Sequence, residues 1–307
     1  YRIEATMKLA DREIGPMQAG FTVKDEAEEW PEWWNRDYGD TDQIIYPFSP
    51  IESVDRSVPG EKDKRDGFSC WGRDYVLNAM GLPDAVYSQG EEVLAEPARI
   101  VVERDGREHA IALGRPTITE HEDYRVRFKG QAEGAGLQFT ATGWLEQDGL
   151  VYIDLTYAPA GEGPVEVDGL RIEFPVSERD ADSLLCVGPG ENYSSRTTML
   201  LPDDRQGRLW STLDTGITGS NMTVGSFYPT MWIGSERRGF LWWADTDRGW
   251  VPKDEVPAHE AVRRGGSVVL INNIIGTSYR LDEARTISLS YNASPFRPLP
   301  DGWRMAI

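Results

Sequence analysis

The sequence is short of several kinds of residue, and each shortage excludes a class of protein. Only six of the 32 basic residues are Lys, and 51 acidic residues bring the net charge to −19. This balance argues against nucleic acid as a partner, because phosphate contacts require clustered Lys and Arg. No stretch approaches the roughly 18 consecutive apolar residues of a membrane-spanning helix, so no membrane insertion is expected.

Histidine and cysteine are also scarce, which limits the metal chemistry. His109, His121 and His259 show no metal-ligand spacing, and Cys70 and Cys186 alone cannot hold zinc. A zinc-type catalytic centre is therefore not expected. The two cysteines are compatible with a disulfide or with two separate buried thiols, and the sequence leaves both alternatives open.

The sequence is rich in aromatic residues and in segments where apolar and polar residues alternate with a period of two. The chain has 11 Trp, 12 Tyr and 9 Phe. Val151, Ile153 and Leu155 alternate with polar residues, as in a strand with one buried face, and segments 170–176 and 287–291 repeat the pattern. Such alternation is typical of β-strands in a sandwich.

Turn residues separate these strands. Asp105-Gly106 and Asp148-Gly149 tolerate the positive φ of tight hairpins, and residues 235–238 connect two further strands. Helix signals are rare and no βαβ alternation occurs. The predicted fold is all-β, a large antiparallel β-sandwich or super-sandwich with few helices, layered as in galactose mutarotases or lectins.

Three regions are expected along the chain. Residues 1–55 contain two N-terminal strands, at 1–9 and 19–24, and an aromatic and acidic lead-in loop. Residues 56–294 form the main β-sandwich. Residues 295–307 are Pro-rich and resemble a linker toward a missing C-terminal domain.

Four segments, in order, carry a family resemblance. They are EEWPEWWNRDYGDTDQIIYPFSPIE (28–52), CWGRDYVLNAMGLPDAVYSQGEEVLAEP (70–97), MWIGSERRGFLWWADTDRGW (231–250) and SPFRPLPDGWR (294–304). Together they resemble the N-terminal β-sandwich region of proteins related to glycoside hydrolase family 123. The resemblance implies a secreted or cell-surface protein that acts on carbohydrate.

In that family, catalysis takes place in a C-terminal (β/α)₈ barrel, where an adjacent Asp-Glu pair assists the acetamide of an N-acetylhexosaminide. This chain ends where the barrel would begin. The dipeptides Asp25-Glu26, Asp254-Glu255 and Asp282-Glu283 lie outside any barrel context. The resemblance therefore implies that the catalytic pair is not in this chain, and whether the chain is itself an enzyme stays open.

Aromatic residues are the candidate ligand contacts, because sugar rings stack their C–H faces on Trp and Tyr. The alternative is that the rings of the lead-in loop pin it to the sandwich or to a neighbouring domain. The candidates are Trp30, Trp33, Trp34, Tyr38, Trp232, Trp243 and Trp250.

Two groups of carboxylates are further candidates. Asp37, Asp40 and Asp42 surround a glycine and form a partial calcium site, although an acidic chain produces such clusters by chance. Asp245 and Asp247 would lie about 6–7 Å apart on one side of an extended strand, a spacing that suits catalysis at a glycosidic bond. The alternative for this pair is a solvated face or ion pairing with Arg237 and Arg238. No cofactor other than calcium at this partial site is expected.

The predicted function is an accessory β-sandwich, without its own catalytic machinery, that braces a catalytic barrel and contacts carbohydrate. Its partners would be a glycan or that barrel domain. Two rivals stay open: a self-contained glycan hydrolase, and a structural subunit of a surface layer or filament that self-assembles.

Overall fold

The computed structural model describes residues 2–8, 13–20, 42–187, 196–215 and 226–298. The chain divides into two compact units, residues 1–43 and residues 44–307. In the smaller unit, β1 (Arg2–Lys8) pairs antiparallel with β2 (Glu13–Gly20), from Arg2 opposite Gly20 to Lys8 opposite Glu13. The second strand was expected at 19–24 and lies earlier, because a hairpin of this register needs a partner directly after β1.

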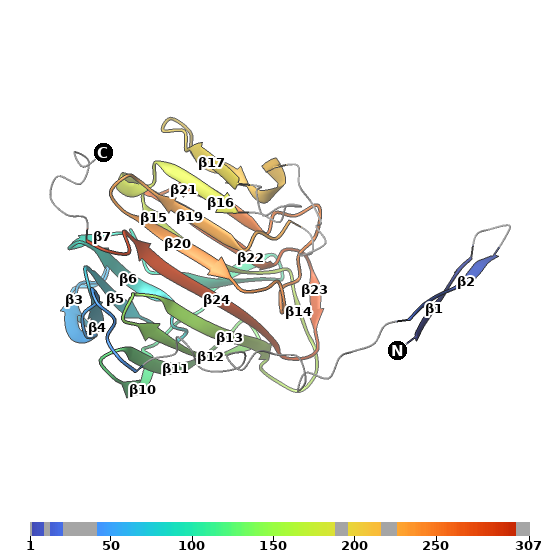
Figure 1. Ribbon diagram of the computed structural model, residues 1–307, viewed down its shortest axis with the longest axis horizontal. Coiled ribbons are helices and arrows are strands. Elements are labelled where there is room, and N and C mark those ends of the chain that lie inside the picture. Colours follow the sequence, from blue (N-terminus) through green and yellow to red (C-terminus); the bar gives the residue numbers. More distant parts are fainter. Residues whose placement is uncertain (1, 9–12, 21–41, 188–195, 216–225, 299–307) are drawn as a thin grey trace. The chain divides into compact units, whose positions relative to one another are not determined.

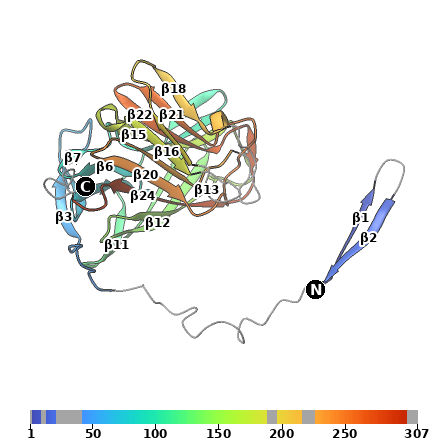
Figure 2. The same ribbon diagram turned by 45° about the horizontal axis from the view of Figure 1, so that its top comes forward.

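The larger unit is built from three large antiparallel sheets (Figures 1 and 2). The nine-stranded sheet has the order β10 (Thr117–His121), β11 (Arg125–Gly134), β12 (Leu137–Glu146), β13 (Val151–Pro159), β24 (Arg285–Ser294), β20 (Gly239–Ala244), β19 (Thr230–Gly234), β16 (Ser183–Val187), β17 (Arg196–Leu200). The six-stranded sheet has the order β18 (Gly207–Ser211), β21 (His259–Arg264), β22 (Ser267–Ile275), β15 (Gly169–Ser177), β8 (Arg99–Arg104), β9 (Arg107–Ala110).

The five-stranded sheet contains β3 (Glu52–Arg56), β4 (Arg65–Cys70), β5 (Arg73–Leu77), β6 (Pro83–Ser88) and β7 (Glu91–Glu92). A short pair joins β14 (Val165–Val167) to β23 (Tyr279–Leu281). The helical turns of the described residues are the 3₁₀ turns η1 (Glu178–Asp180) and η2 (Thr212–Thr215). The prediction of an all-β fold with few helices is confirmed, and no described helix has the length and hydropathy to cross a membrane.

The main core lies between the nine-stranded and six-stranded sheets, which stack as layers in Figure 2. Phe174 of β15 meets Phe240 of β20, with ring centroids 5.0 Å apart, and lies 6.3 Å from Tyr291 of β24. The predicted alternation holds: Val151, Ile153 and Leu155 are all buried while the residues between them are half-buried. Period-two patterning therefore decided which side chains enter the core.

The three predicted hairpins are present, but the second has a different turn conformation from the one expected. Asp105 and Gly106 both have positive φ, 53° and 67°, as expected for a two-residue turn. At the second hairpin only Gly149 has a positive φ, 78°, and Leu150 donates to the Asp148 side chain at 2.9 Å. The third hairpin joins β19 to β20 through residues 235–238.

His259 lies within the core and is enclosed by aromatic rings. Its ring centroid is 5.0 Å from Trp242, 5.4 Å from Phe227 and 5.6 Å from Trp250, and its Nδ1 lies 2.8 Å from Asn272 Oδ1. Burial lowers the pKa of His259 to about 4. Nε2 of His259 and Nε1 of both tryptophans have no hydrogen-bond partner among the described residues.

The outer face of the six-stranded sheet carries a saturated ion-pair cluster. The fully buried Glu173 carboxylate accepts hydrogen bonds from Arg99 at 2.6 Å and Arg171 at 2.7 Å, and pairs with Arg264. Burial alone would raise the pKa of Glu173, but the hydrogen bonds from Arg171 and Arg99, with the charge of Arg264, hold it below its usual range.

Cys70 and Cys186 are both buried and free, so the structure has two separate thiols and no disulfide between them. Burial raises the pKa of the Cys70 thiol to about 12. A thiol held protonated in this way is a poor nucleophile and a poor metal ligand.

Candidate functional site

The outer face of the nine-stranded sheet carries a line of aromatic side chains. The register places Trp144 opposite Tyr152, Tyr152 opposite Ser290, and Ser290 opposite Trp243, across β12, β13, β24 and β20. The Trp144 and Tyr152 rings stack, with centroids 4.3 Å apart and planes inclined by 16°. We call Trp144, Tyr152 and Trp243 the aromatic row; all three are half-buried, so part of each ring faces solvent.

Carboxylates flank this row. Asp154 accepts hydrogen bonds from Ser288 Oγ at 2.5 Å and from the Tyr152 hydroxyl at 3.4 Å. Burial raises the pKa of Tyr152, and the nearby charges of Asp154 and Asp245 raise it further. The phenol therefore stays protonated, and the flank presents hydroxyl donors beside carboxylate acceptors.

Trp232 lies on the same face. It is two residues after Thr230, which pairs with Trp243, and side chains two residues apart in a strand point to the same side of the sheet. Its ring covers Gly234 and Gly239, and a Cβ at either glycine would overlap the indole. Its Nε1 donates to Ser294 Oγ at 3.0 Å. The glycines and this hydrogen bond together fix the ring against the sheet.

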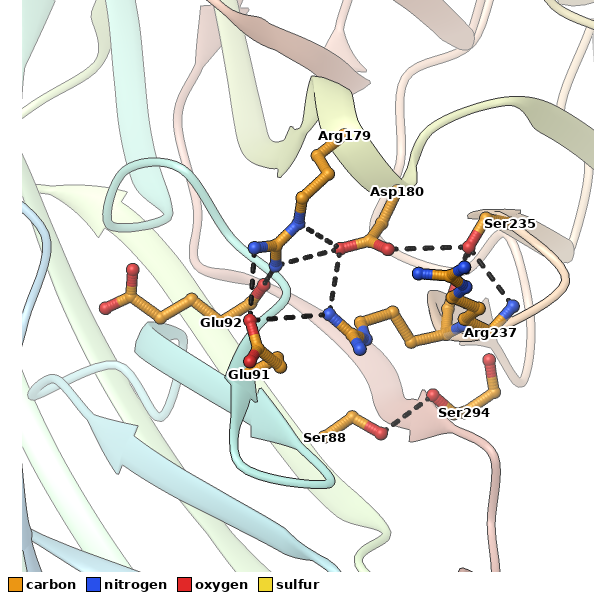
Figure 3. Close-up of polar contacts among 9 residues, drawn as sticks. Ser88, Glu91, Glu92, Arg179, Asp180, Ser235, Arg237 and Ser294 are labelled. Atoms are coloured by element: carbon orange, nitrogen blue, oxygen red, sulfur yellow. Dashed lines mark hydrogen bonds and ion pairs between the residues drawn. The ribbon is translucent and has the colours of Figure 1, made fainter. Parts of the chain in front are cut away.

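A charged pocket of about 450 Å³ opens beside the turn that follows Gly234. It is built from β7, from η1 and from the β19–β20 turn. Its lining includes Glu91, Arg179, Asp180, Ser235, Arg237 and Arg238. Three segments distant in sequence therefore meet here, as Figure 3 shows.

Asp180 organises the charged pocket. Its side chain is 4% exposed and accepts hydrogen bonds from Arg179 at 3.1 and 3.2 Å, from Arg238 at 3.4 Å and from Ser235 at 3.4 Å (Figure 3). Arg179 also donates to Glu91 at 3.1 Å. Buried charges need such partners, so the geometry of these groups is set before any ligand arrives.

A serine pair connects strand β6 to Trp232. Ser88 Oγ donates to the Ser294 carbonyl at 3.0 Å, and Ser294 Oγ is the acceptor for Trp232 Nε1. Ser88 ends β6, and Glu91 begins the adjacent strand β7. Figure 3 shows the serine pair in the same view as the network around Asp180.

The structure places the predicted aromatic residues in different environments. Trp232 and Trp243 lie on the outer face of the nine-stranded sheet. Trp250 is only 3% exposed and packs 6.0 Å from Trp242, so its ring belongs to the core and offers no platform for a ligand. The physical reason is that β20 ends at Ala244 and the turn that follows, closed by Trp250 N to Asp247 O and with Gly249 at φ +84°, brings the ring of Trp250 beside Trp242.

The lead-in loop falls outside the described residues. This applies to Trp30, Trp33, Trp34, Tyr38, Asp37 and Asp40, while Asp42 is described and exposed. Within the described part of the chain, no three His, Cys, Asp or Glu side chains gather as a metal site would require. Calcium binding by the loop stays a prediction.

The expectation that Asp245 and Asp247 share one strand is wrong. β20 ends at Ala244, and the two residues lie in a turn closed by a hydrogen bond from Trp250 N to Asp247 O at 3.0 Å. Asp245 is exposed and Asp247 half-buried. A spacing calculated from strand rise therefore does not apply to this pair.

Sequence reasoning missed Trp144, Tyr152 and the residues of the charged pocket. A signal existed for the first two, since both occupy outward positions of alternating strands. The pocket residues gave no local signal, because Glu91 and Asp180 are brought together only by the tertiary fold. Arg238 had been noted only as a partner for acids on its own hairpin.

Residues 62–241 match the family described as "Glycoside hydrolase 123, third domain", and this is more than half of the chain. The chain belongs to this family. As a glycoside hydrolase 123 third domain with a β-sandwich fold, it fits an accessory domain of a glycoside hydrolase.

Solved structures resemble this third domain at low identity. They include a putative aldose 1-epimerase from Escherichia coli K12 (TM-score 0.38, 10% identity, 80% of this chain and 99% of that one). Others are a galactose 1-epimerase from Lactobacillus acidophilus (0.40, 11%, 80% and 99%) and the Slr1438 protein from Synechocystis (0.44, 9%, 82% and 99%). Because these TM-scores lie below 0.5, the fold assignment rests on the sheets themselves. No curated protein matches the chain.

Proposed function

We propose that this chain is an accessory, non-catalytic β-sandwich of a glycoside-hydrolase-like protein. In this role it braces a catalytic domain and holds a glycan against the outer face of the nine-stranded sheet. The observation that carries the proposal is the aromatic row with its flanking carboxylates, on a domain of the glycoside hydrolase 123 family. A secreted or cell-surface location follows from the same proposal.

The chemistry of the aromatic row suits a sugar chain. Pyranose rings present apolar C–H faces to Trp and Tyr, and their hydroxyls bond to carboxylates and phenols. Trp144 and Tyr152 are already stacked, and Asp154 already has donors in Ser288 and Tyr152. Side chains held in place before binding lose little conformational freedom when the ligand arrives.

Two carboxylates of the charged pocket, Asp180 and Glu91, support a role in binding rather than in bond cleavage. Glycosidic cleavage requires one carboxyl group that donates a proton and a second that acts as base or nucleophile. Asp180 and Glu91 both accept hydrogen bonds from Arg179, and Asp180 accepts further ones from Arg238 and Ser235. Neither offers an unpaired carboxyl for transfer of a proton to a leaving group.

The test is a glycan-array screen of the isolated chain, with an assay for released sugar on every ligand found. We expect binding without turnover. Trp243→Ala should weaken binding about five- to thirty-fold, because loss of one stacked ring removes roughly 1–2 kcal/mol. Tyr46→Ala is the matched control, since Tyr46 is 93% exposed and lies outside the aromatic row.

Turnover by the isolated chain would overturn the non-catalytic assignment. An absence of both binding and turnover would remove the glycan part of the proposal and leave the bracing role. Self-association in solution without glycan affinity would instead support an assembly subunit.

A further inference from the structure

We infer that the charged pocket and the adjoining Trp232 form a subsite for one neutral pyranose unit. The ring of the sugar would lie against Trp232, and its hydroxyls would bind between Glu91 and Arg238. The inference rests on the proposed function and deepens it, because it names the kind of sugar unit and the residues that select it.

The first support is the rigidity of Trp232. The indole lies over Gly234 and Gly239 with no room for a Cβ beneath it, and Ser294 Oγ holds its Nε1 at 3.0 Å. A ring fixed at its edge and on one face has only its other face to offer a ligand. Carbohydrate platforms require such a fixed, flat apolar surface.

The second support is the unused hydrogen-bonding capacity of Arg238. Its Nη1 lies 3.8 Å from Glu91 Oε2, beyond hydrogen-bond range, and 3.4 Å from Asp180 Oδ2, near the limit. A hydroxyl placed between them can donate to Glu91 and accept from Arg238 at ordinary distances. Arg179 holds both carboxylates from the other side, so the gap is maintained.

The size of the charged pocket suits one sugar unit. A volume of about 450 Å³ falls within the range of roughly 300–1,000 Å³ that is usual for small-molecule sites. The lining is polar and charged, and Trp232 packs on Gly234 and Gly239, the two glycines that bracket the turn 235–238. This composition favours a ligand with many hydroxyls over an apolar one.

Charge selects a neutral unit over an acidic one. The lining contains the carboxylates of Glu91, Asp180, Asp182 and Glu236 against the guanidiniums of Arg179, Arg237 and Arg238. Arg179 and Arg238 already face carboxylates, and the whole chain carries a net charge of −19. A uronic acid would therefore meet a field that opposes its binding.

The experiment is saturation-transfer NMR and calorimetric titration of the full chain with glucose, galactose and mannose, and with glucuronic acid as the acidic comparison. We expect at least one neutral sugar to bind and glucuronic acid to bind more weakly. Glu91→Gln and Arg238→Gln should each weaken the neutral sugar about ten-fold, as expected for hydrogen bonds to charged groups.

Glu166→Gln and Arg280→Gln are matched controls, because this exposed pair, 3.9 Å apart, lies on β14 and β23. Their affinities should equal that of the unchanged chain. Thermal unfolding of each variant checks that the fold is retained. If Arg238→Gln does not fold, Glu91→Gln still tests the inference, because Glu91 is exposed and its replacement should leave the fold intact.

Two results would overturn the inference. One is a preference for glucuronic acid. The other is array binding that Trp243→Ala abolishes while both charged-pocket variants leave it unchanged, and in this case the proposed function survives. If neither the array nor the sugar panel shows binding, the glycan part of the proposed function fails together with the inference.

Discussion

Trp242 and Trp243 are neighbours in β20, yet their side chains lie on opposite faces of the nine-stranded sheet, one in the core and one at the surface. Trp242 is fully buried against His259 and Trp250, where it contributes to the core between the two large sheets. Trp243 is half-buried and completes the aromatic row on the outer face. A side chain of the same size and chemistry therefore stabilises the core at one position and is partly exposed to solvent at the next.

Polar groups without a partner occur on both faces. On the outer face Trp232 Nε1 and the hydroxyls of Tyr152 and Ser288 have partners, whereas Trp144 Nε1 has none among the described residues. In the core Nε2 of His259 and Nε1 of Trp242 and Trp250 have none among the described residues, whereas the hydroxyls of Tyr157 and Tyr291 donate to backbone carbonyls. The two faces therefore differ chiefly in the burial of their aromatic rings. The following substitutions test this contrast.

Trp242→Ala should have the largest effect on stability. Removing a fully buried indole leaves a cavity in the core, and large-to-small changes of this kind lower the free energy of unfolding by about 3–5 kcal/mol. Chemical denaturation measures the loss. Trp243→Ala is the neighbouring control and should cost less than about 1 kcal/mol while it weakens glycan binding; equal losses at the two positions would refute the contrast between the faces.

Acid should destabilise the core next most strongly, through His259. Because burial lowers its pKa from 6.5 to about 4, the unfolded chain binds a proton between these values and the folded chain does not. Stability is therefore fully present above pH 6.5 and is lost as the pH falls toward 4, by about 3 kcal/mol in all.

The measurement is the free energy of unfolding as a function of pH for the unchanged chain and for His259→Gln. The Gln variant should lack this part of the pH dependence. His109→Gln, at an exposed position of β9, should retain it. An unchanged slope in His259→Gln would contradict the assignment.

Glu173→Gln tests whether the outer face of the six-stranded sheet contributes to stability without contributing to glycan binding. It removes the charge that Arg99, Arg171 and Arg264 share, and breaking a buried ion pair is destabilising. Since Arg99 and Arg264 are 38% and 40% exposed, water compensates part of the loss, and we expect about 2 kcal/mol at neutral pH.

The sign of its pH dependence follows from the lowered pKa of Glu173. The contribution is present above the unfolded value of 4.5 and is lost as the pH falls below it, so the difference between Glu173→Gln and the unchanged chain should shrink in acid. Glycan binding should not change. A binding defect in this variant would mean that the six-stranded sheet also carries a ligand face.

Gly239→Ala should have the smallest effect on stability and a clear effect on Trp232. A Cβ at this position would overlap the indole and would lie 2.8 Å from the backbone Ile233 O, so the ring and the strand must both shift, at a cost of about 1–2 kcal/mol. Near-ultraviolet circular dichroism would report the shift, and sugar affinity should fall. Gly161→Ala is the control, because nothing lies within 4 Å of a Cβ there; the same spectral change in both variants would count against the fixed ring.

Much of the fold was predictable because its information is local. Alternation in 151–157 gave β13 and its buried face, and Asp105-Gly106 gave the β8–β9 turn, since each depends on residues close in sequence. The charged pocket was not predictable, because Glu91, Asp180 and Arg238 meet only after strands from three segments have paired. Trp250 was misplaced because the sequence places it after a turn but does not show that this turn returns its ring to the core, beside Trp242 and His259.

The order of strands in the nine-stranded sheet has a consequence for how the protein is made. β24, the last described strand along the chain, lies in the interior of the sheet between β13 and β20. During synthesis, the group β10–β13 and the group β16, β17, β19 and β20 each keep one unpaired edge until residues 285–294 leave the ribosome. Open strand edges invite pairing with other chains. A chain terminated before residue 285 would lack the element that joins the two halves of the sheet and would leave both edges open.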